Sequence, residues 1–334
     1  MHFYIIISSL LLIVLHSHIS SIEAAKTSKD DRKKKHKTKD PKNLSNICGT
    51  EYPLSPQALK FAEKVYDMSG SGALRRSSSA QHQALCWMVL SDGLQLNSSD
   101  KLLLERYALV TLYAASNGST GDSWIIKENW LSKTSHCKWY GVKCYSNGRT
   151  KSLNLNFNGL SGVCPKEIGL ALGELKSLYL HSNELQGKIP TSIFSLKKLK
   201  YLQLHANNFE GTLPDLSNVT NLRELYVYGN NLSGSIPKSI SKLRNLEVLD
   251  LYSNNFSGFV NDKTFDGLNK LKEVYLDDTN FTGKISKNSA ICKNNLEYFT
   301  SDCRGGMNAE VSCACCTKCC HDKADPKCIE MKGQ

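Results

Sequence analysis

The sequence predicts an α/β solenoid, a fold in which one repeated unit forms one coil and successive coils stack side by side. A phrase with leucines at fixed positions and an asparagine near its middle recurs six times between residues 150 and 290. Helix signals precede the repeats, and cysteines crowd the chain after them. Both ends therefore have material for the caps that a solenoid needs to cover the apolar side chains of its end coils.

The repeat asparagine marks one position in every coil. Successive copies are 25, 24, 23, 24 and 25 residues apart, a length that suits one short strand and a return segment. The positions are Asn158, Asn183, Asn207, Asn230 and Asn254, followed by Thr279, where a threonine replaces the asparagine.

One repeat shows why these residue types recur. Leu202 and Leu204 lie two apart on an expected strand, so both point inward. Gln203 and His205 then point outward. Asn207 ends the strand, where its short amide side chain can bond backbone groups of its own turn and of the next coil. Stacked coils therefore predict a continuous leucine core beside a ladder of asparagines.

The second half of the repeat carries a resemblance to a known family. Residues 187–190 and 234–237 read G-K-I-P and G-S-I-P, and residues 137–144 upstream read C-K-W-Y-G-V-K-C. These motifs resemble the plant-type extracellular leucine-rich-repeat proteins, which include polygalacturonase inhibitors and receptor ectodomains, and the family's N-terminal cap. The resemblance implies a right-handed superhelix with a parallel concave β-sheet, a helical N-terminal cap and a disulfide-rich C-terminal cap. Residues 258–261 and 283–286 lack the proline, so we expect the last two coils to depart from the regular shape.

Asp302-Cys303 and the cysteine-rich tail add a narrower resemblance. They look like the C-terminal cap of secreted leucine-rich-repeat proteins in diatoms and related algae. The expected domains are a signal peptide at 1–24, a basic disordered linker at 25–47, a helical cap at 48–150, six repeats and a partial one at 151–300, and a Cys-rich cap at 301–334.

The N-terminus predicts secretion. An apolar run at residues 3–15 is too short to span a bilayer and precedes a small-residue cleavage signal, as in a secretory signal peptide. No later stretch approaches about 18 apolar residues, so we expect a soluble extracellular protein at the cell wall or cell surface, with no transmembrane segment. An extracellular chain is not expected to bind nucleic acid.

A basic segment follows, from Lys26 to Lys42. It holds nine Lys or Arg against three Asp and therefore contributes six of the chain's eleven net positive charges. Association with an anionic cell-surface polymer is one interpretation, and a solvated linker or removable pro-segment is the other.

Helix signals fill the expected N-terminal cap. Apolar residues have helical spacing at 56–66, with Ser55 as the N-cap, and again at 84–90 and 102–115. The polar stretch 69–79 predicts an exposed loop.

Thirteen cysteines suit an oxidising compartment, and their odd number leaves one unpaired. Cys137 and Cys144 are close enough to pair, Cys48 with Cys86 is a candidate second bridge, and Cys164 occupies an inward position that suits a buried free thiol. The others are Cys292, Cys303, Cys313, Cys315, Cys316, Cys319, Cys320 and Cys328, which could form four bridges.

Two metal-site alternatives are weaker. Cys316 and Cys319 have zinc-ligand spacing beside His321, but cysteines after the last coil of a secreted chain more often form disulfides. His181 and His205 fall in one outward column without a third ligand nearby. We therefore predict no metal and no cofactor.

Outward strand positions form columns across the coils and give the candidate binding face. Aromatic and imidazole side chains there suit a peptide, a glycan or a protein loop, although tyrosines in a sheet can also simply pack on their cross-strand neighbours. The candidate ligand-binding residues are Tyr179, His181, His205, Tyr226, Tyr228, Asp250, Tyr252, Tyr275 and Asp277. A third outward column, from Phe157 to Asp278, consists mostly of small residues.

Asn-x-Ser/Thr sequons also agree with secretion. The glycosylation candidates are Asn43, Asn97, Asn117, Asn218, Asn231, Asn255 and Asn280. The last three directly follow the repeat position, so the repeat phrase itself generates them.

These features favour a secreted recognition protein that binds an extracellular protein, peptide or polysaccharide on its concave face. An inhibitor of a cell-wall-degrading hydrolase and an extracellular matrix or adhesion component are the alternatives. We predict no enzyme, because no catalytic motif occurs and an open sheet is not expected to offer a water-excluding cleft that would shift a carboxylate pKa.

Overall fold

The computed structural model describes residues 44–51, 54–92, 101–117, 123–303, 311–320 and 329–330. The expected signal peptide and the basic segment up to residue 43 lie outside the described residues. Secretion and attachment through that segment therefore stay predictions.

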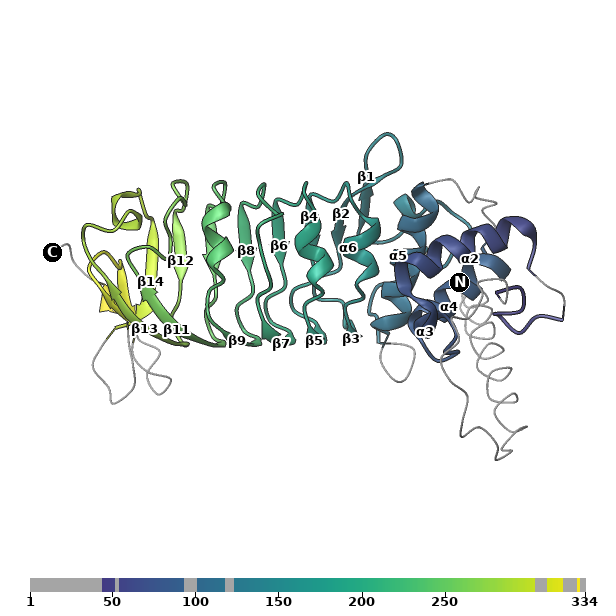
Figure 1. Ribbon diagram of the computed structural model, residues 1–334, viewed down its shortest axis with the longest axis horizontal. Helices are drawn as coiled ribbons and strands as arrows, with labels where there is room; N and C mark the ends of the chain where they lie inside the picture. Colours follow the sequence, from purple (N-terminus) through teal and green to yellow (C-terminus); the bar gives the residue numbers. More distant parts are fainter. Residues whose placement is uncertain are drawn as a thin grey trace, which may run out of the picture. The chain divides into compact units, whose positions relative to one another are not determined.

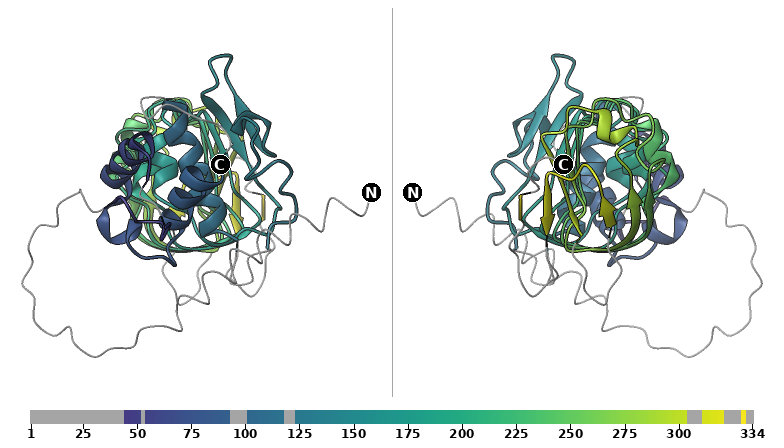
Figure 2. Two further views of the ribbon diagram at one scale, coloured as in Figure 1. Left: turned by 90° about the vertical axis from the view of Figure 1, so that its right-hand side faces the viewer. Right: turned by 90° about the vertical axis from the view of Figure 1, so that its left-hand side faces the viewer.

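The repeats form a solenoid whose coils stack side by side through two mostly parallel sheets (Figure 1). Seen along the stack, the coils superpose (Figure 2). The large sheet has the order β1-β2-β4-β6-β8-β10-β12-β14-β16-β17 and the small sheet β15-β13-β11-β9-β7-β5-β3. The large sheet comprises β1 (Val142–Cys144), β2 (Thr150–Asn154), β4 (Ser177–Tyr179), β6 (Tyr201–Gln203), β8 (Glu224–Tyr226), β10 (Val248–Asp250), β12 (Glu273–Tyr275), β14 (Tyr298–Asp302), β16 (Lys318–Cys320) and β17 (Ile329–Glu330).

The leucine columns form the core between the two sheets, as the repeat predicts. Leu202 and Leu204 are fully buried, and their counterparts in neighbouring coils pack against them. Burial of a leucine contributes about 1.5–3 kcal/mol, but one coil alone would leave half of each leucine in water. The fold class is therefore confirmed, and its stability depends on neighbouring coils.

The asparagine ladder is also confirmed, except that each side chain bonds the preceding coil and not the next one. The Asn207 side chain donates to the carbonyls of Leu180 (2.9 Å), Leu204 (3.1 Å) and His205 (3.3 Å), while its Oδ1 accepts from the Leu185 N–H (3.0 Å). It thus satisfies buried backbone groups in two coils at once.

The small sheet was not predicted. The second half of each repeat forms one of its strands: β3 (Ser161–Val163), β5 (Glu184–Lys188), β7 (Asn208–Thr212), β9 (Asn231–Gly234), β11 (Asn255–Asn261) and β13 (Asn280–Ile285), with β15 (Val311–Cys313) at one edge. Its glycines hide the strand signal, because glycine is rare in strands. They are needed here for close approach: Gly283 has φ 129°, and a Cβ on it would lie 2.1 Å from the carbonyl oxygen of Val260.

The prolines limit the length of these strands. β5 ends before Pro190, and β9 ends before Pro237. In the two coils without the proline, β11 has seven residues and β13 has six, against five in β5 and four in β9. The last two coils therefore depart from the regular shape, as expected, in that their strands in the small sheet are longer.

Helices cover the first coil and connect the later ones. They are α2 (Pro56–Ser69), α3 (Ser71–Leu74), α4 (Ala80–Leu90), α5 (Lys101–Ala115) and α6 (Glu167–Ala171), with 3-10 turns η2 (His136–Lys138), η3 (Thr191–Ser195), η4 (Lys238–Lys242) and η5 (Ile291–Lys293). Ser55 caps α2 by accepting from the Ala58 N–H at 3.2 Å. The expected loop at 69–79 is wrong, because it contains α3, whose Leu74 is fully buried. Among the described residues, no helix has the length and apolar content to cross a bilayer.

A buried arginine joins the helices of this cap to the segment that leads into the first coil. The Arg106 guanidinium lies 4.5 Å from the Trp139 ring and 5.3 Å from the Trp87 ring. It donates to both carboxylate oxygens of Asp92 (2.7 and 2.9 Å) and to the Ser132 and Thr134 carbonyls. Stacking and a bidentate pair together compensate the removal of this charge from water.

Disulfides occur in both caps. The structure joins Cys48 to Cys86 and Cys137 to Cys144, and it leaves Cys164 as a buried free thiol. At the C-terminal end, Cys292–Cys315, Cys303–Cys319 and Cys313–Cys316 are paired, and Cys320 is also disulfide-bonded. Cysteines that form disulfides do not offer thiolates to zinc.

Candidate ligand-binding face

The outer face of the large sheet carries the predicted columns in register. Asn154, Tyr179, Gln203 and Tyr226 occupy equivalent positions on β2, β4, β6 and β8. The column continues through Asp250, Tyr275 and Thr300 on β10, β12 and β14. A further outward column, which the sequence analysis missed, contains Ser152, Ser177, Tyr201, Glu224, Val248, Glu273 and Tyr298.

Five rings on this face form a continuous series across two adjacent columns, which we call the ring ladder. Its members are Phe157, His181, His205, Tyr228 and Tyr252. Ring centroids are 4.3 Å apart for His181 and His205 and 4.3 Å for His205 and Tyr228, with nearly parallel planes. Phe157 meets His181 edge-on at 5.6 Å, and Tyr252 lies 6.3 Å from Tyr228. Cross-strand packing therefore occurs, yet Tyr252 stays 38% exposed, so the ladder keeps a face toward solvent.

The two histidines are neutral at neutral pH. Burial lowers the pKa of His181, and burial together with His181 lowers the pKa of His205 to about 4. Both Nδ1 atoms are buried without a hydrogen-bond partner. A buried N–H without an acceptor is costly, so we assign the proton to Nε2 in each ring. Each imidazole then has one N–H donor and no positive charge.

The remaining tyrosines lie beside the ladder. Tyr226 contacts the His205 ring edge-on at 5.9 Å, and burial, with Glu224 next, raises the pKa of Tyr226 to about 12. The Tyr275 hydroxyl donates to Glu273 Oε2 at 2.9 Å. Tyr179 is half-buried in the same column. All of the predicted tyrosines therefore share one face, although Tyr275 points its hydroxyl at a carboxylate.

The predicted carboxylates differ from expectation. Asp250 and Asp277 are each only 8% exposed, not fully outward. Burial, with Asp277 and Glu273 contributing, raises the pKa of Asp250 to about 7. Burial also raises the pKa of Asp277, whose carboxylate accepts from the Thr300 hydroxyl. The expectation that an open sheet leaves such pKa values unshifted is therefore wrong, because aromatic neighbours on adjacent strands exclude water without a cleft.

Asp302 extends this acidic group and was missed. It accepts from the backbone N–H groups of Asp278 (3.0 Å) and Thr279 (3.1 Å), and burial raises its pKa to about 6. Register places it beside Asp277, because Tyr275 pairs with Thr300. The repeat phrase ends at Thr279, so the outward columns predicted from the sequence did not include the next strand, β14, which carries Asp302.

The column of small residues has a conformational cause. Phe157, Ser182, Ala206, Ser253 and Asp278 all have φ between 49° and 55°, and Gly229 has φ 61°. Residues in this left-handed region are usually short or glycine, which explains the small side chains. Phe157 is the exception, and it is 67% exposed.

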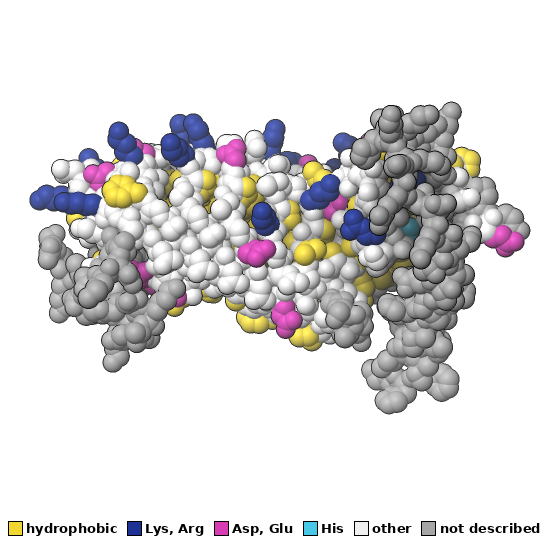
Figure 3. All heavy atoms as spheres, turned by 60° about the horizontal axis from the view of Figure 1, so that its bottom comes forward, with side chains coloured by type: hydrophobic (Ala, Val, Ile, Leu, Met, Phe, Trp, Pro, Cys, Tyr) yellow, Lys and Arg dark blue, Asp and Glu magenta, His cyan; other side chains and the backbone are white. Residues whose placement is uncertain are grey.

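The small sheet presents a different surface. Its exposed positions are largely Asn, Ser and Thr, and Figure 3 shows this side with few charged side chains in its lower part. Asn231, Asn255 and Asn280 begin strands of this sheet and are exposed, as is Asn218. Asn117 is only 7% exposed, which makes a glycan on it unfavourable in the folded chain, because a glycan needs an accessible amide. Asn43 and Asn97 lie outside the described residues.

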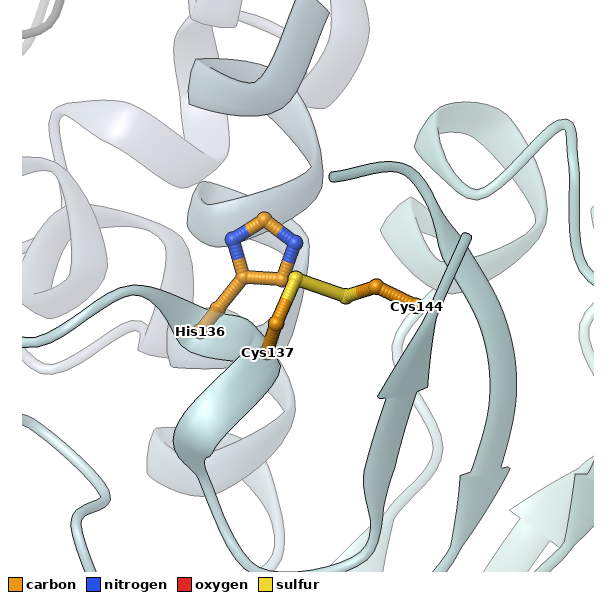
Figure 4. A group of neighbouring side chains, drawn as sticks. All are labelled: His136, Cys137 and Cys144. Carbon is orange, nitrogen blue, oxygen red and sulfur yellow. A yellow bond between two sulfur atoms is a disulfide. The ribbon is translucent and has the colours of Figure 1, made fainter. Parts of the chain in front are cut away.

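A group that could hold a metal lies in the N-terminal cap. His136, Cys137 and Cys144 place their ligand atoms within 4.8 Å of one another. Figure 4 shows both sulfurs joined in one bond. The group therefore fits a disulfide rather than a metal site, since a metal needs the thiolates.

Comparison with known proteins identifies the repeats. The family model for the leucine-rich repeat matches residues 149–209 and 220–281. A probable inactive receptor kinase of Arabidopsis thaliana is 40% identical over 101 residues, which cover 30% of this chain and 14% of that protein. Protein MALE DISCOVERER 1 of the same species is 35% identical over 118 residues, which cover 35% of this chain and 16% of that protein. The chain thus spans about a sixth or less of the length of these relatives.

A solved structure is similar over a longer stretch. It is the leucine-rich-repeat ectodomain of the Arabidopsis thaliana membrane receptor kinase GASSHO1/SCHENGEN3, in complex with CASPARIAN STRIP INTEGRITY FACTOR 2. The TM-score is 0.54 with 29% identity, covering 64% of this chain and 24% of that one.

Proposed function

We propose that this chain, which is built from leucine-rich repeats of the plant extracellular type, binds a peptide or protein ligand on the outer face of its large sheet. The related ectodomain of the receptor kinase GASSHO1/SCHENGEN3 has a ligand bound in its crystal structure, which supports a recognition role for the same kind of solenoid. The disulfides in both caps support an extracellular location.

The ring ladder is the observation that carries the proposal. Its aromatic rings and neutral imidazoles offer apolar area and Nε2–H or hydroxyl donors at low conformational cost. The small sheet offers mainly short polar side chains and two isolated large apolar ones, Val163 and Phe259. A ligand therefore gains more by covering the large sheet.

A capture experiment tests this assignment. The wild-type full chain and the triple variant His205→Ala, Tyr228→Ala, Tyr252→Ala serve as immobilised baits for extracellular extract, and bound proteins are compared by mass spectrometry. Phe259→Ala is the matched control, because Phe259 is 68% exposed on the small sheet. We expect a partner that the wild type and the control retain and the triple variant loses. Equal retention of a partner by all three baits would show that the partner binds another surface of the chain.

A further inference from the structure

The ring ladder ends at Phe157, a residue whose backbone conformation and exposure do not stabilise the fold. Phe157 holds a left-handed backbone (φ 50°) that usually goes to short residues, and its ring is 67% exposed. The backbone of Ile125, a residue that is 72% exposed, is bonded to the residue that follows Phe157, because the Ile125 N–H donates to the Asn158 carbonyl at 3.0 Å. Backbone strain and exposed apolar area both cost stability, and such costs concentrate at functional sites. This end of the face, as far as the structure describes it, is therefore apolar.

The opposite end of the face is acidic. Asp250 ends β10, Asp277 follows the neighbouring strand β12, and Asp302 ends the next strand, β14. Among the described residues, no Lys or Arg forms an ion pair with any of these three. Arg223 pairs with Glu247 (3.3 Å) and Lys272 with Glu297 (3.9 Å), and Lys318, which is in register with Thr300, lies 5.8 Å from the Tyr298 ring. Buried carboxylates without a counter-charge favour a cationic group that reaches them from the open side.

We propose that the occupant of this face is an extended peptide segment of another protein, which places an apolar side chain on Phe157 and Ile125 and a Lys or Arg side chain beside Asp250, Asp277 and Asp302. The inference rests on the proposed function and adds a polarity and a length to it. Charge complementarity selects the basic end of the peptide, and the exposed rings select the apolar end.

The spacing of the strands sets the length. Phe157 follows β2 and Asp277 follows β12, which are five strand intervals apart in the large sheet. At about 4.8 Å per interval the two ends are separated by about 24 Å, which an extended chain covers in about seven residues at about 3.3 Å each. The peptide crosses the strands, so its side chains meet successive members of the ring ladder.

Selection from a phage-displayed library of random dodecamer peptides tests the polarity. The full-length wild-type chain is the bait at neutral pH and low salt. We expect the enriched peptides to carry a Lys or Arg and an apolar residue about six to eight positions apart. The double variant Asp250→Asn, Asp277→Asn should lose the preference for the basic residue. Phe157→Asn, which tolerates the left-handed backbone, should lose the preference for the apolar one.

Affinity measurements complete the test. A fluorescently labelled peptide from the wild-type selection should bind the double variant about tenfold or more weakly, since it loses charge-assisted hydrogen bonds. Phe259→Ser on the small sheet should bind as the wild type does, and circular dichroism checks that every variant is folded. Enriched peptides without the basic residue, or unchanged affinity in the folded double variant, would overturn the polarity alone. A wild-type bait that enriches no peptide over background would overturn the proposed peptide ligand itself.

Discussion

At the scale of single residues, burial on the large sheet has opposite effects on acids and on histidines. Asp250 has its pKa raised from 3.8 to about 7, whereas His205 has its pKa lowered from 6.5 to about 4. In both cases loss of water disfavours the charged form. Each group therefore makes the free energy of unfolding depend on pH, in opposite directions.

Replacing Asp250 with Asn should stabilise the fold at high pH. Between about pH 4 and 7 the folded state binds more protons at Asp250 than the unfolded state, so wild-type stability falls as pH rises through that window. We expect Asp250→Asn to be about 1–3 kcal/mol more stable than the wild type at pH 8, with the gain vanishing near pH 4. Urea midpoints at the two pH values measure this. Asp266→Asn, at an exposed position, is the control, and a gain of equal size at pH 4 and pH 8 would contradict the explanation.

Replacing His205 with Tyr should reduce the loss of folding stability at acidic pH. The folded state resists protonation of His205, so its stability is lost as pH falls from about 6.5 toward 4. Tyrosine retains a ring between His181 and Tyr228 and has no charge to gain. We expect the variant to be about 1 kcal/mol more stable than the wild type at pH 5, allowing for solvent screening, and nearly equal at pH 8. Thermal melting at both pH values measures the difference, and parallel pH profiles would refute it.

The sequence located the aromatic columns correctly because strand alternation depends only on neighbouring residues. It could not predict the burial of Asp250 or Asp277, since that depends on which side chains the adjacent coils place beside them. The left-handed column had a signal, namely the small residues before each repeat asparagine, but small size alone does not show that the backbone requires it.

At the scale of elements, the asparagine ladder connects each strand of the large sheet to the strand of the small sheet that follows. Its members were predictable because one short amide side chain must hydrogen-bond backbone groups of two coils, which requires an asparagine at the same position of each repeat. The small sheet was not, because its glycines and prolines resemble turn residues when neighbouring coils are out of view. Only stacking reveals that these segments pair.

Removing one member of the ladder should weaken the solenoid strongly. Asn207→Ala leaves the buried Leu185 N–H without its acceptor, whereas the Leu180 and Leu204 carbonyls keep the side chains of Asn183 and Asn230 as donors. We expect a loss of about 1–3 kcal/mol in the free energy of unfolding, because one buried N–H is left unsatisfied. Urea denaturation measures the loss. The neighbouring exposed Asn208→Ala should change it by less than about 0.5 kcal/mol, and equal effects would count against the ladder.

At the scale of the whole molecule, each coil contacts its neighbours only, so stability depends on both end caps. The caps contain the described disulfides and the most buried charges, as expected where an open stack must be closed. Helix signals and cysteine spacing predicted that both caps exist. The pairing in the C-terminal cap could not be derived, because many pairings of eight cysteines are compatible with one sequence.

Loss of Arg106 should loosen the N-terminal cap before the rest. Arg106→Leu leaves Asp92 without its bidentate partner and removes the cation between Trp87 and Trp139. We expect a loss of about 3–5 kcal/mol, with faster amide hydrogen exchange in α4 and α5 than in the coils around β10. Exposed Arg76→Leu is the control. Uniformly faster exchange along the chain would argue against a local role.

Both ends of the large sheet reverse direction. β1 runs antiparallel to β2, and β17 runs antiparallel to β16, whereas every pairing between them is parallel. Duplication of a unit next to either reversal would place a parallel strand where an antiparallel one now closes the stack, and would disturb the cap packed there. Duplication of an internal repeat keeps both antiparallel end pairs and adds one more parallel strand to each sheet. Related proteins with more or fewer repeats should accordingly gain or lose them between β4 and β12. A longer binding face would then come from repeats added in the middle of the chain.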